Sequence, residues 1–287
     1  MTIEIGKYVE QFVDWLSTVG RPFFDQVAYI IGTSVKNLQV ILNAIPTPLM
    51  IAIIALIALI AMTGIRRFPT RIKNYRRSFS LPVFVLLGLT LISLMGFWSQ
   101  LIDTLVLVIV STVIILLIGI PLGILCAKSP KTDATVRPIL DFMQTMPAFV
   151  YLIPAILFFS VGDVPGVLAT VIFSLPPAVR MTSLGIKEVP EDIIEASLAF
   201  GCTNSQMLYK VQIPLAMPTI LAGVNQTIML ALSMVVICSM VGAGGLGESV
   251  YASIQQADMA LGFEAGLSIV ILAIILDRIT QAVGRTK

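Results

Sequence analysis

The 287-residue sequence contains no histidine and few charged residues, which make up 12% of the chain with a formal net charge of +2. The lack of histidine excludes Ser-His-Asp and Cys-His catalysis, histidine-ligated zinc or haem, and histidine proton relays. The small, dispersed net charge does not favour nucleic-acid binding. We therefore expect neither a nucleic-acid partner nor a histidine-based enzyme.

Cysteine and phosphate-binding motifs are also scarce. Cys126, Cys202 and Cys238 lie far apart without CxxC spacing, so we expect small apolar side chains rather than a disulfide framework. No GxxxxGK[ST] phosphate loop occurs, so the chain cannot be its own ATPase of that kind. We expect no catalytic residue, no metal and no cofactor in this chain.

Hydrophobic residues make up 57% of the sequence, and the mean hydropathy is +0.98. A soluble domain has about 25% charged residues, and a chain this apolar could not cover its surface with polar groups. The sequence therefore predicts an all-α, polytopic membrane protein. Seven apolar runs are long enough to cross a bilayer, namely 48–65, 80–97, 103–127, 138–159, 164–182, 218–242 and 262–281.

The first 47 residues have a different pattern. Apolar residues between Ile5 and Val19 share one helical face and polar ones the other, which predicts an amphipathic helix in the membrane interface. Residues 27–45 are interrupted by Lys36, Asn37, Gln39 and Asn43. This run is either a second interfacial or partly buried helix or an eighth span. We expect residues 1–47 to form an extracytoplasmic tail.

Basic residues predict the orientation. All of the 18 Lys and Arg residues except Lys7, Arg21 and Lys36 fall in four regions that seven spans place on one side. These regions are 66–79, 128–137, 180–217 and 277–287. The positive-inside rule then places the C-terminus, with the short tail 282–287, in the cytoplasm and the N-terminus outside.

Prolines between 138 and 177 predict kinked spans. Pro138, Pro147, Pro154, Pro165, Pro176 and Pro177 fall in 138–159 and 164–182. Broken helices are tolerated in a membrane where they line a cavity or pack in protein. We expect these two spans and 218–242 to surround a translocation path, although the kinks could instead only shape packing. The candidate lining residues are Met143, Met146, Phe149, Asn225, Met229 and Ser233.

Carboxylates are scarce inside the spans. Asp141, Glu264 and Asp277 lie near span ends and not at the midplane, where an ion-driven carrier usually places a carboxylate. This favours energy supplied by another subunit.

Two glycine patterns predict close packing or a turn. Gly119 with Gly123, and Gly262 with Gly266, match the small-xxx-small pattern of packed membrane helices. The run 242–247 is glycine-rich and directly follows a span. We expect it to form a flexible re-entrant turn at the outer mouth.

Segment 187–217 is a long polar interruption between two spans. It predicts a helix around Glu191–Phe200, a break at Gly201, and a second helix from Asn204 that Pro214 stops. Such a projection is either a rigid docking element for a soluble partner or an ordinary amphipathic hairpin.

The residues of this segment resemble the EAA loop of bacterial ABC importer permeases. That pattern is EAA, three residues, glycine, nine residues, then I-x-L-P. Ser197, Val211 and Ile213 are conservative departures from it. The matching residues are Glu195, Ala196, Ser197, Gly201, Val211, Ile213 and Pro214. The resemblance implies that this loop couples the chain to an ATP-hydrolysing subunit.

Further stretches at 140–159, 174–190 and 231–247 resemble permeases of the glycine betaine/proline class of osmoprotectant importers. The likeness covers about residues 100–281. It implies a type I ABC importer core there, with 48–99 as two peripheral helices, in a bacterial cytoplasmic membrane.

The resemblance also implies partners. These are a second permease copy, an ATPase dimer that holds ATP and magnesium, and an external substrate-binding protein. Because the chain ends just past the last span, we expect that binding protein to be a separate polypeptide. The pattern leaves open a permease for methionine or another amino acid. A stand-alone secondary transporter would need inverted repeats and midplane ionic sites, which the sequence does not show.

Overall fold

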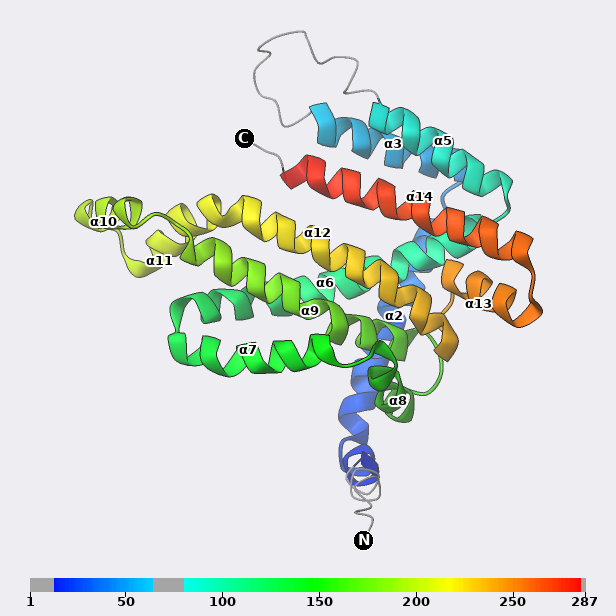
Figure 1. Ribbon diagram of the computed structural model, residues 1–287, viewed down its shortest axis with the longest axis horizontal. Helices are drawn as coiled ribbons and strands as arrows, with labels where there is room; N and C mark the ends of the chain where they lie inside the picture. The colour runs from blue at the N-terminus through cyan, green and yellow to red at the C-terminus, as the bar shows by residue number, and fades with distance from the viewer. Residues whose placement is uncertain (1–12, 64–79, 285–287) are drawn as a thin grey trace.

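The computed structural model describes residues 13–63 and 80–284, and none of these residues forms a β-strand (Figure 1). Four long apolar helices form the centre, and each is long enough to cross a membrane. These are α6 (Trp98–Lys128), α9 (Asp163–Lys187), α12 (Ile213–Cys238) and α14 (Met259–Gly284). The predicted all-helical polytopic class is confirmed. The basic cluster between Arg66 and Arg77 and most of the predicted amphipathic helix at the N-terminus lie outside the described residues.

Two further helix pairs are bent. Helices α2 (Arg21–Asn43) and α3 (Thr47–Thr63) meet at 104°, and α7 (Pro130–Thr145) and α8 (Ala148–Phe159) meet at 97°. The shorter apolar helix α5 (Ser80–Leu94) completes the set that corresponds to the predicted runs.

The run 138–159 is therefore not one straight span, which corrects the sequence-based prediction. It breaks at Met146, whose ψ of 137° is extended, directly before Pro147. Proline disfavours the helical conformation of the residue before it, which explains the position of the break. The other prolines do not break their helices. Helix α9 continues through Pro176 and Pro177, and it is the most buried of the four candidate spans among the described residues.

Close backbone approach joins α6, α9 and α12. A Cβ atom at Gly119 would lie 2.9 Å from the Cβ of Ala178, and one at Gly123 would lie 2.6 Å from the Cβ of Thr182. Both distances are too short for a real side chain, so only glycine lets α6 approach α9 this closely. The predicted packing role of these two glycines is confirmed. In contrast, a Cβ at Gly266 would meet nothing within 4 Å.

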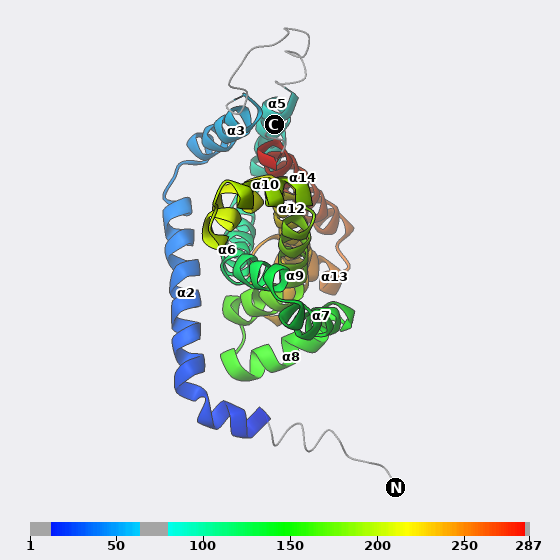
Figure 2. The same cartoon turned by 90° about the vertical axis from the view of Figure 1, so that its left-hand side faces the viewer.

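Helices α3, α5 and α14 lie side by side at one edge of the bundle (Figures 1 and 2). On another side, α2 crosses α6 and α9 instead of running along them. Two residues of α2, Ile31 and Val35, are buried, and the amide of Gln39 donates to the carboxylate of Asp103 on α6 over 3.1 Å. Residues 27–43 are therefore part of one continuous helix, α2, that packs across the bundle.

The glycine-rich run 242–247 is fastened at both sides. The N–H of Gly244 donates to Asp163 over 3.1 Å, and the N–H of Leu246 donates to Thr104 over 2.8 Å. A helix that the sequence analysis missed, α13 (Leu246–Gln256), begins within the last two residues of this run. The predicted flexible turn is thus a hydrogen-bonded connection, because its backbone N–H groups find partners on α6 and α9.

Candidate functional site

Segment 187–217 forms a helical projection between the ends of α9 and α12, at what we call the α10 end of the bundle (Figure 1). Its first helix is α10 (Glu191–Ala199). Glu191 and Asp192 occupy the first turn, where the helix dipole favours negative charge. No residue of α10 is buried, so its sides are open to a partner.

Gly201 ends α10 in a Schellman motif. The N–H of Cys202 donates to the carbonyl of Ser197 over 3.1 Å, and the N–H of Gly201 donates to the carbonyl of Leu198 over 2.9 Å. The φ of Gly201 is +78°, a left-handed conformation that costs other residues free energy. A Cβ there would meet nothing within 4 Å. Glycine is therefore required by the backbone conformation and not by space.

The second helix of the projection begins with a capping box. The hydroxyl of Thr203 accepts from the N–H of Gln206, and the side-chain oxygen of Gln206 accepts from the N–H of Thr203. Helical turns then run without interruption from α11 (Asn204–Gln206) through the π-helix η2 (Met207–Gln212) into α12.

The prediction that Pro214 stops this helix is wrong. Pro214 lies in the first turn of α12, directly after the π-helical turn. The N–H of Ile213 donates to the carbonyl of Leu208, five residues earlier. The wider turn changes the backbone geometry in front of the proline, and so relieves the clash that its ring makes with the carbonyl four residues earlier in a regular α-helix.

Apolar side chains are exposed on the projection. Phe200 is 90% exposed, Tyr209 66% and Leu198 51%. Glu195 and Ala196 are exposed beside them. Exposed apolar side chains grouped with a charge are typical of a surface that another protein covers.

The opposite side of the projection is anchored. Leu208 forms a small buried cluster with Ile186 at the end of α9 and with Ala216 and Ile220 of α12. Val211 and Ile213 are half-buried, and Pro214 is exposed. The hydroxyl of Ser197 donates to the carbonyl of Ile193 within α10. Because the cluster joins both spans, a displacement of the projection acts on α9 and α12 together.

The predicted path residues fall into two groups. Met143, Met146 and Phe149 lie around the α7–α8 bend, the first two half-buried against the main core and Phe149 52% exposed. Met229 and Ser233 lie on α12, and Ser233 is exposed.

Asn225 faces another helix. Its amide nitrogen donates to Asp277 of α14 over 2.9 Å, and its amide oxygen accepts from the hydroxyl of Thr280 over 2.8 Å. Gln281 also donates to both oxygens of Asp277. This polar cluster fastens α12 to α14.

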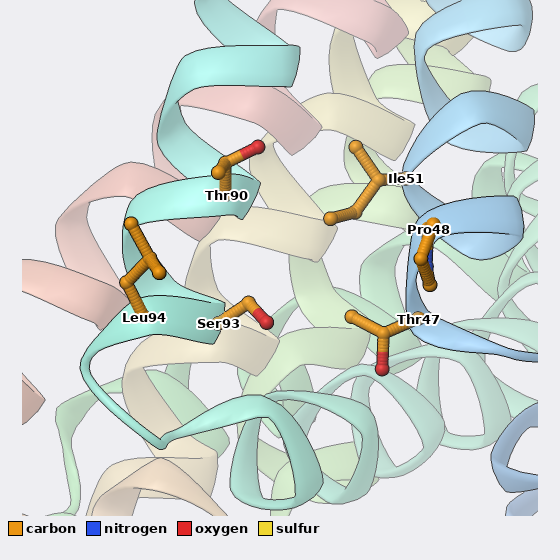
Figure 3. A pocket seen from close by; sticks show the side chains of 6 residues that line it. All are labelled: Thr47, Pro48, Ile51, Thr90, Ser93 and Leu94. Atoms are coloured by element: carbon orange, nitrogen blue, oxygen red, sulfur yellow. The ribbon is translucent and has the colours of Figure 1, made fainter.

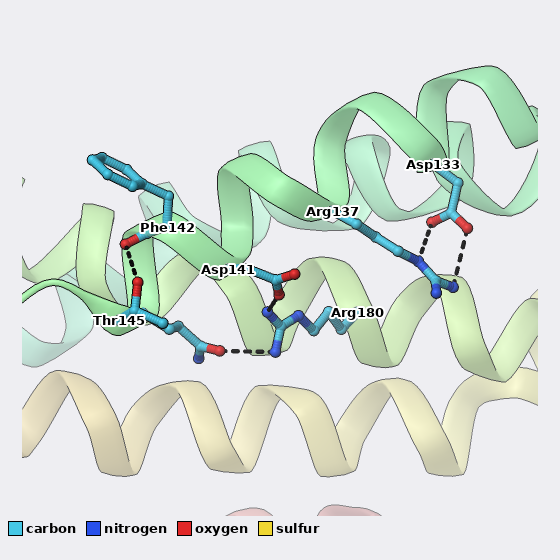
Figure 4. A network of polar contacts seen from close by, with 7 residues as sticks. Asp133, Arg137, Asp141, Phe142, Thr145 and Arg180 are labelled. Atoms are coloured by element: carbon cyan, nitrogen blue, oxygen red, sulfur yellow. Dashed lines mark hydrogen bonds and ion pairs between the residues drawn. The ribbon is translucent and has the colours of Figure 1, made fainter.

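Ion pairs that the sequence analysis missed form between α7 and α9. Lys187 contacts Asp133 over 2.7 Å. Arg180 contacts Asp141 (Figure 4), and it also donates to the amide oxygen of Gln144 over 2.8 Å. The acids are eight positions apart on α7 and the bases seven apart on α9, so each pair shares one helical face. This matched spacing in two adjacent helices was the signal available in the sequence.

A cavity of about 360 Å³ lies between α3 and α5 (Figure 3). It is open to the surface and has no charged lining residue; the lining residues are Thr47, Pro48, Ile51, Thr90, Ser93 and Leu94. It lies outside the α6, α9 and α12 group. Among the described residues, no group of three or more Cys, Asp and Glu side chains is placed to hold a metal ion.

Residues 119–286 match the family described as "Binding-protein-dependent transport system inner membrane component". Among curated proteins, the chain is 48% identical to the glycine betaine transport system permease protein OpuAB of Bacillus subtilis, over 99% of this chain and 96% of that one. It is also 48% identical to the glycine betaine/proline betaine permease protein ProW of Escherichia coli, over 99% of this chain and 76% of that one.

Among solved structures, the chain is similar to an inward-facing form of the MetNI methionine ABC transporter. The TM-score is 0.58 at 27% identity, over 63% of this chain and 93% of that chain. The family match covers more than half of the chain, and it includes the projection, α9, α12 and the last part of α6, from Gly119. The chain belongs to the family of inner-membrane components of binding-protein-dependent transport systems.

Proposed function

We propose that this chain is the permease subunit of an ATP-driven importer for glycine betaine, proline betaine and related quaternary ammonium or proline-type osmoprotectants. The observation that carries the proposal is the projection at the α10 end, where a glycine-jointed helix pair is rooted in α9 and α12 and exposes Phe200 beside Glu195. The substrate class rests on the permeases named above, which are almost half identical over nearly the whole chain.

The chain is a multi-pass inner-membrane subunit without its own cofactor, and it works with an ATPase on another polypeptide. ATP and magnesium belong to that ATPase. The coupling residues that we assign are those of the EAA-like pattern, namely Glu195, Ala196, Ser197, Gly201, Val211, Ile213 and Pro214.

The proposed assembly has two copies of this chain, an ATPase dimer at the α10 end and a separate binding protein at the opposite end. The α10 end is then cytoplasmic, in agreement with the basic regions and with an N-terminal tail outside. Residues 100–281 form the transport core and 48–99 the periphery.

In the transport cycle, the translocation path opens alternately to the outside and to the cytoplasm. ATP binding closes the ATPase dimer and moves the projections of both copies together, and the clusters around Leu208 transmit this movement to α9 and α12. The path opens outward and accepts substrate from the binding protein, and hydrolysis resets it. In this account Met143, Met146, Phe149, Met229 and Ser233 line the path, while the amide of Asn225 is engaged by α14.

A methionine importer is the second candidate, because the matching solved structure is a methionine transporter. It has the weaker support, since that chain is 27% identical whereas the betaine permeases are 48% identical.

Uptake separates the two candidates. The chain, its ATPase and its binding protein are reconstituted in proteoliposomes and supplied with ATP inside and radiolabelled glycine betaine or methionine outside. We expect ATP-dependent uptake of glycine betaine only. Uptake of methionine alone would reject the betaine assignment, and uptake without ATP would reject the importer class.

A further inference from the structure

We propose that Arg180, Asp141 and Gln144 form a substrate-binding site for zwitterions on the wall of the translocation path. The inference rests on the proposed function and adds the residues that would recognise the carboxylate and the cation of the cargo. The three side chains meet between α7 and α9 (Figure 4).

Arg180 lies inside the predicted span 164–182, and its ion pair with Asp141 is still accessible at the surface of the chain. Arg180 is in a helix that ends at Lys187, about 10 Å further along the axis at 1.5 Å per residue. Leu184 lies between Arg180 and that end, and Ile139 and Phe142 flank Asp141; all three are exposed apolar side chains. The side chains of Arg180 and Asp141 are 41% and 64% exposed.

Charged side chains at this depth are costly against lipid, and in membrane proteins they face water-filled cavities or other protein. The surface near the ion pair carries further polar side chains, which favours contact with water over contact with lipid. Thr145 on α7 and Gln226 and Ser233 on α12 are also exposed polar residues inside candidate spans. Gln226 lies about 3 Å beyond the level of Arg180 at 1.5 Å per residue, because Gly223 packs against Met181 and α12 runs in the direction opposite to α9 (Figure 1). Each of α7, α9 and α12 thus carries at least one exposed polar or charged residue within its candidate span.

The geometry of Arg180 suits a carboxylate. One terminal nitrogen of its guanidinium donates to Gln144 and the other to Asp141. A substrate carboxylate can accept both of these donors in the forked arrangement that guanidinium groups favour. Asp141, once released, faces the positive group of the same molecule. The charges exchange partners and the net charge of the site stays at zero, which avoids leaving an unpaired charge at membrane depth.

A cation that lacks a carboxylate cannot make this exchange. It could pair with Asp141 only by leaving Arg180 uncompensated. The site is therefore expected to favour compounds with one carboxylate and one quaternary or secondary ammonium over simple quaternary amines such as choline.

The first test uses the full complex in proteoliposomes with radiolabelled glycine betaine. We expect Arg180→Gln to reduce betaine imported per ATP hydrolysed by about tenfold or more, while ATP hydrolysis stimulated by loaded binding protein stays within about twofold. Arg137→Gln is the matched control, because Arg137 is an exposed arginine of α7 that pairs with Asp133, and it should leave import per ATP unchanged.

The outcomes are distinguishable. If the unmodified complex imports no glycine betaine, the proposed function fails. If it does and Arg180→Gln imports equally well per ATP, the zwitterion site is rejected. If Arg180→Gln instead lowers hydrolysis and recovery of the complex along with import, the pair is a structural tether and the site is again rejected.

A second test measures access to water. In a Cys202→Ser background, Arg180→Cys should react with a charged, water-soluble thiol reagent, and glycine betaine should slow the reaction. Leu117→Cys is the control, since Leu117 is 71% exposed on α6 and should face lipid. An unreactive position 180 would show that this position is closed to water, and a disulfide at position 180 between two copies of the chain would show a contact between copies. Either result would overturn the proposal.

Discussion

The hydroxyl of Thr104 on α6 accepts a hydrogen bond from the backbone N–H of Leu246, over 2.8 Å, and donates to the carbonyl of Gln100. Both Thr104 and Leu246 are fully buried. A Cβ at Gly245 would lie 2.5 Å from this hydroxyl oxygen, so a glycine is needed for the approach. One threonine thus fixes the connection between α12 and α13 to a central span.

Replacing Thr104 with valine keeps the shape and removes both bonds. We expect Thr104→Val to lower the free energy of unfolding by about 1–3 kcal/mol, because the buried N–H of Leu246 loses its partner. Thermal unfolding in detergent measures the change. Ser34→Ala is the control, since the exposed hydroxyl of Ser34 bonds only within its own helix, and an equal loss there would contradict the account.

The contact of Gly123 with α9 gives a second stability prediction. A Cβ at this position would lie 2.7 Å from the carbonyl oxygen of Val179, which is backbone and cannot move aside. We expect Gly123→Ala to cost about 1–3 kcal/mol through overpacking. Gly266→Ala, with open space around it, should be neutral or slightly stabilising. Equal melting temperatures for the two variants would refute the close packing of α6 on α9.

A substitution at Asn225 tests whether this residue packs α12 against α14 or lines the translocation path. Because its amide bonds both Asp277 and Thr280, we expect Asn225→Ala to destabilise the chain by about 1–3 kcal/mol and to leave betaine import per ATP unchanged. Gln226→Ala, which removes an exposed neighbour, should not affect unfolding. A loss of import without a loss of stability would place Asn225 in the path after all.

The sequence predicted those parts of the fold that depend only on the length of an apolar run. The runs that became α6, α9, α12 and α14 were found because a span needs about 20 apolar residues. The sequence analysis did not place the break at Met146, because prolines occur at several positions of this region. Tertiary packing decides at which of these prolines the helix continues and at which it ends. The π-helical turn before Pro214 has no local sequence signature. Helix α13 was not predicted because the glycine-rich run at its start indicates a turn.

The candidate site was predictable where spacing fixes geometry. The sequence pattern around Gly201 predicted two helices separated by a glycine, and in the structure Gly201 has the left-handed backbone conformation. The pairing of Arg180 with Asp141 was missed because it depends on two helices lying side by side, which no local pattern reports.

The exposed Phe200 gives a prediction about partner binding. A phenylalanine 90% exposed on a projection is expected to be an anchor in the interface with the ATPase. Phe200→Ser should weaken that association about tenfold or more, because burial of the ring no longer contributes. Affinity is measured by titrating purified ATPase onto the permease in nanodiscs. Phe263→Ser, which changes a phenylalanine 72% exposed on α14, should bind the ATPase normally, and equal weakening by both would reject the anchor.

Substitutions at Gly201, the residue that joins α10 to the second helix of the projection, test the coupling of ATP hydrolysis to import. A valine there would have to adopt a φ near +78°, which costs a β-branched residue about 1–2 kcal/mol or more. We expect Gly201→Val to bind ATPase but to import about tenfold less betaine per ATP. Gly201→Asn is the matched control, because asparagine tolerates the left-handed region, and it should retain most of the coupling. Normal coupling in the valine variant would contradict the role of the joint.

The central claim is that this chain couples a betaine path to an external ATPase, and one measurement addresses it directly. The permease and its ATPase are purified together in nanodiscs, and ATP hydrolysis is measured with binding protein, with and without glycine betaine. The account predicts a stable complex whose hydrolysis rises only when binding protein and glycine betaine are both present. A chain that binds no ATPase, or a complex whose hydrolysis ignores glycine betaine while responding to another ligand, would contradict it.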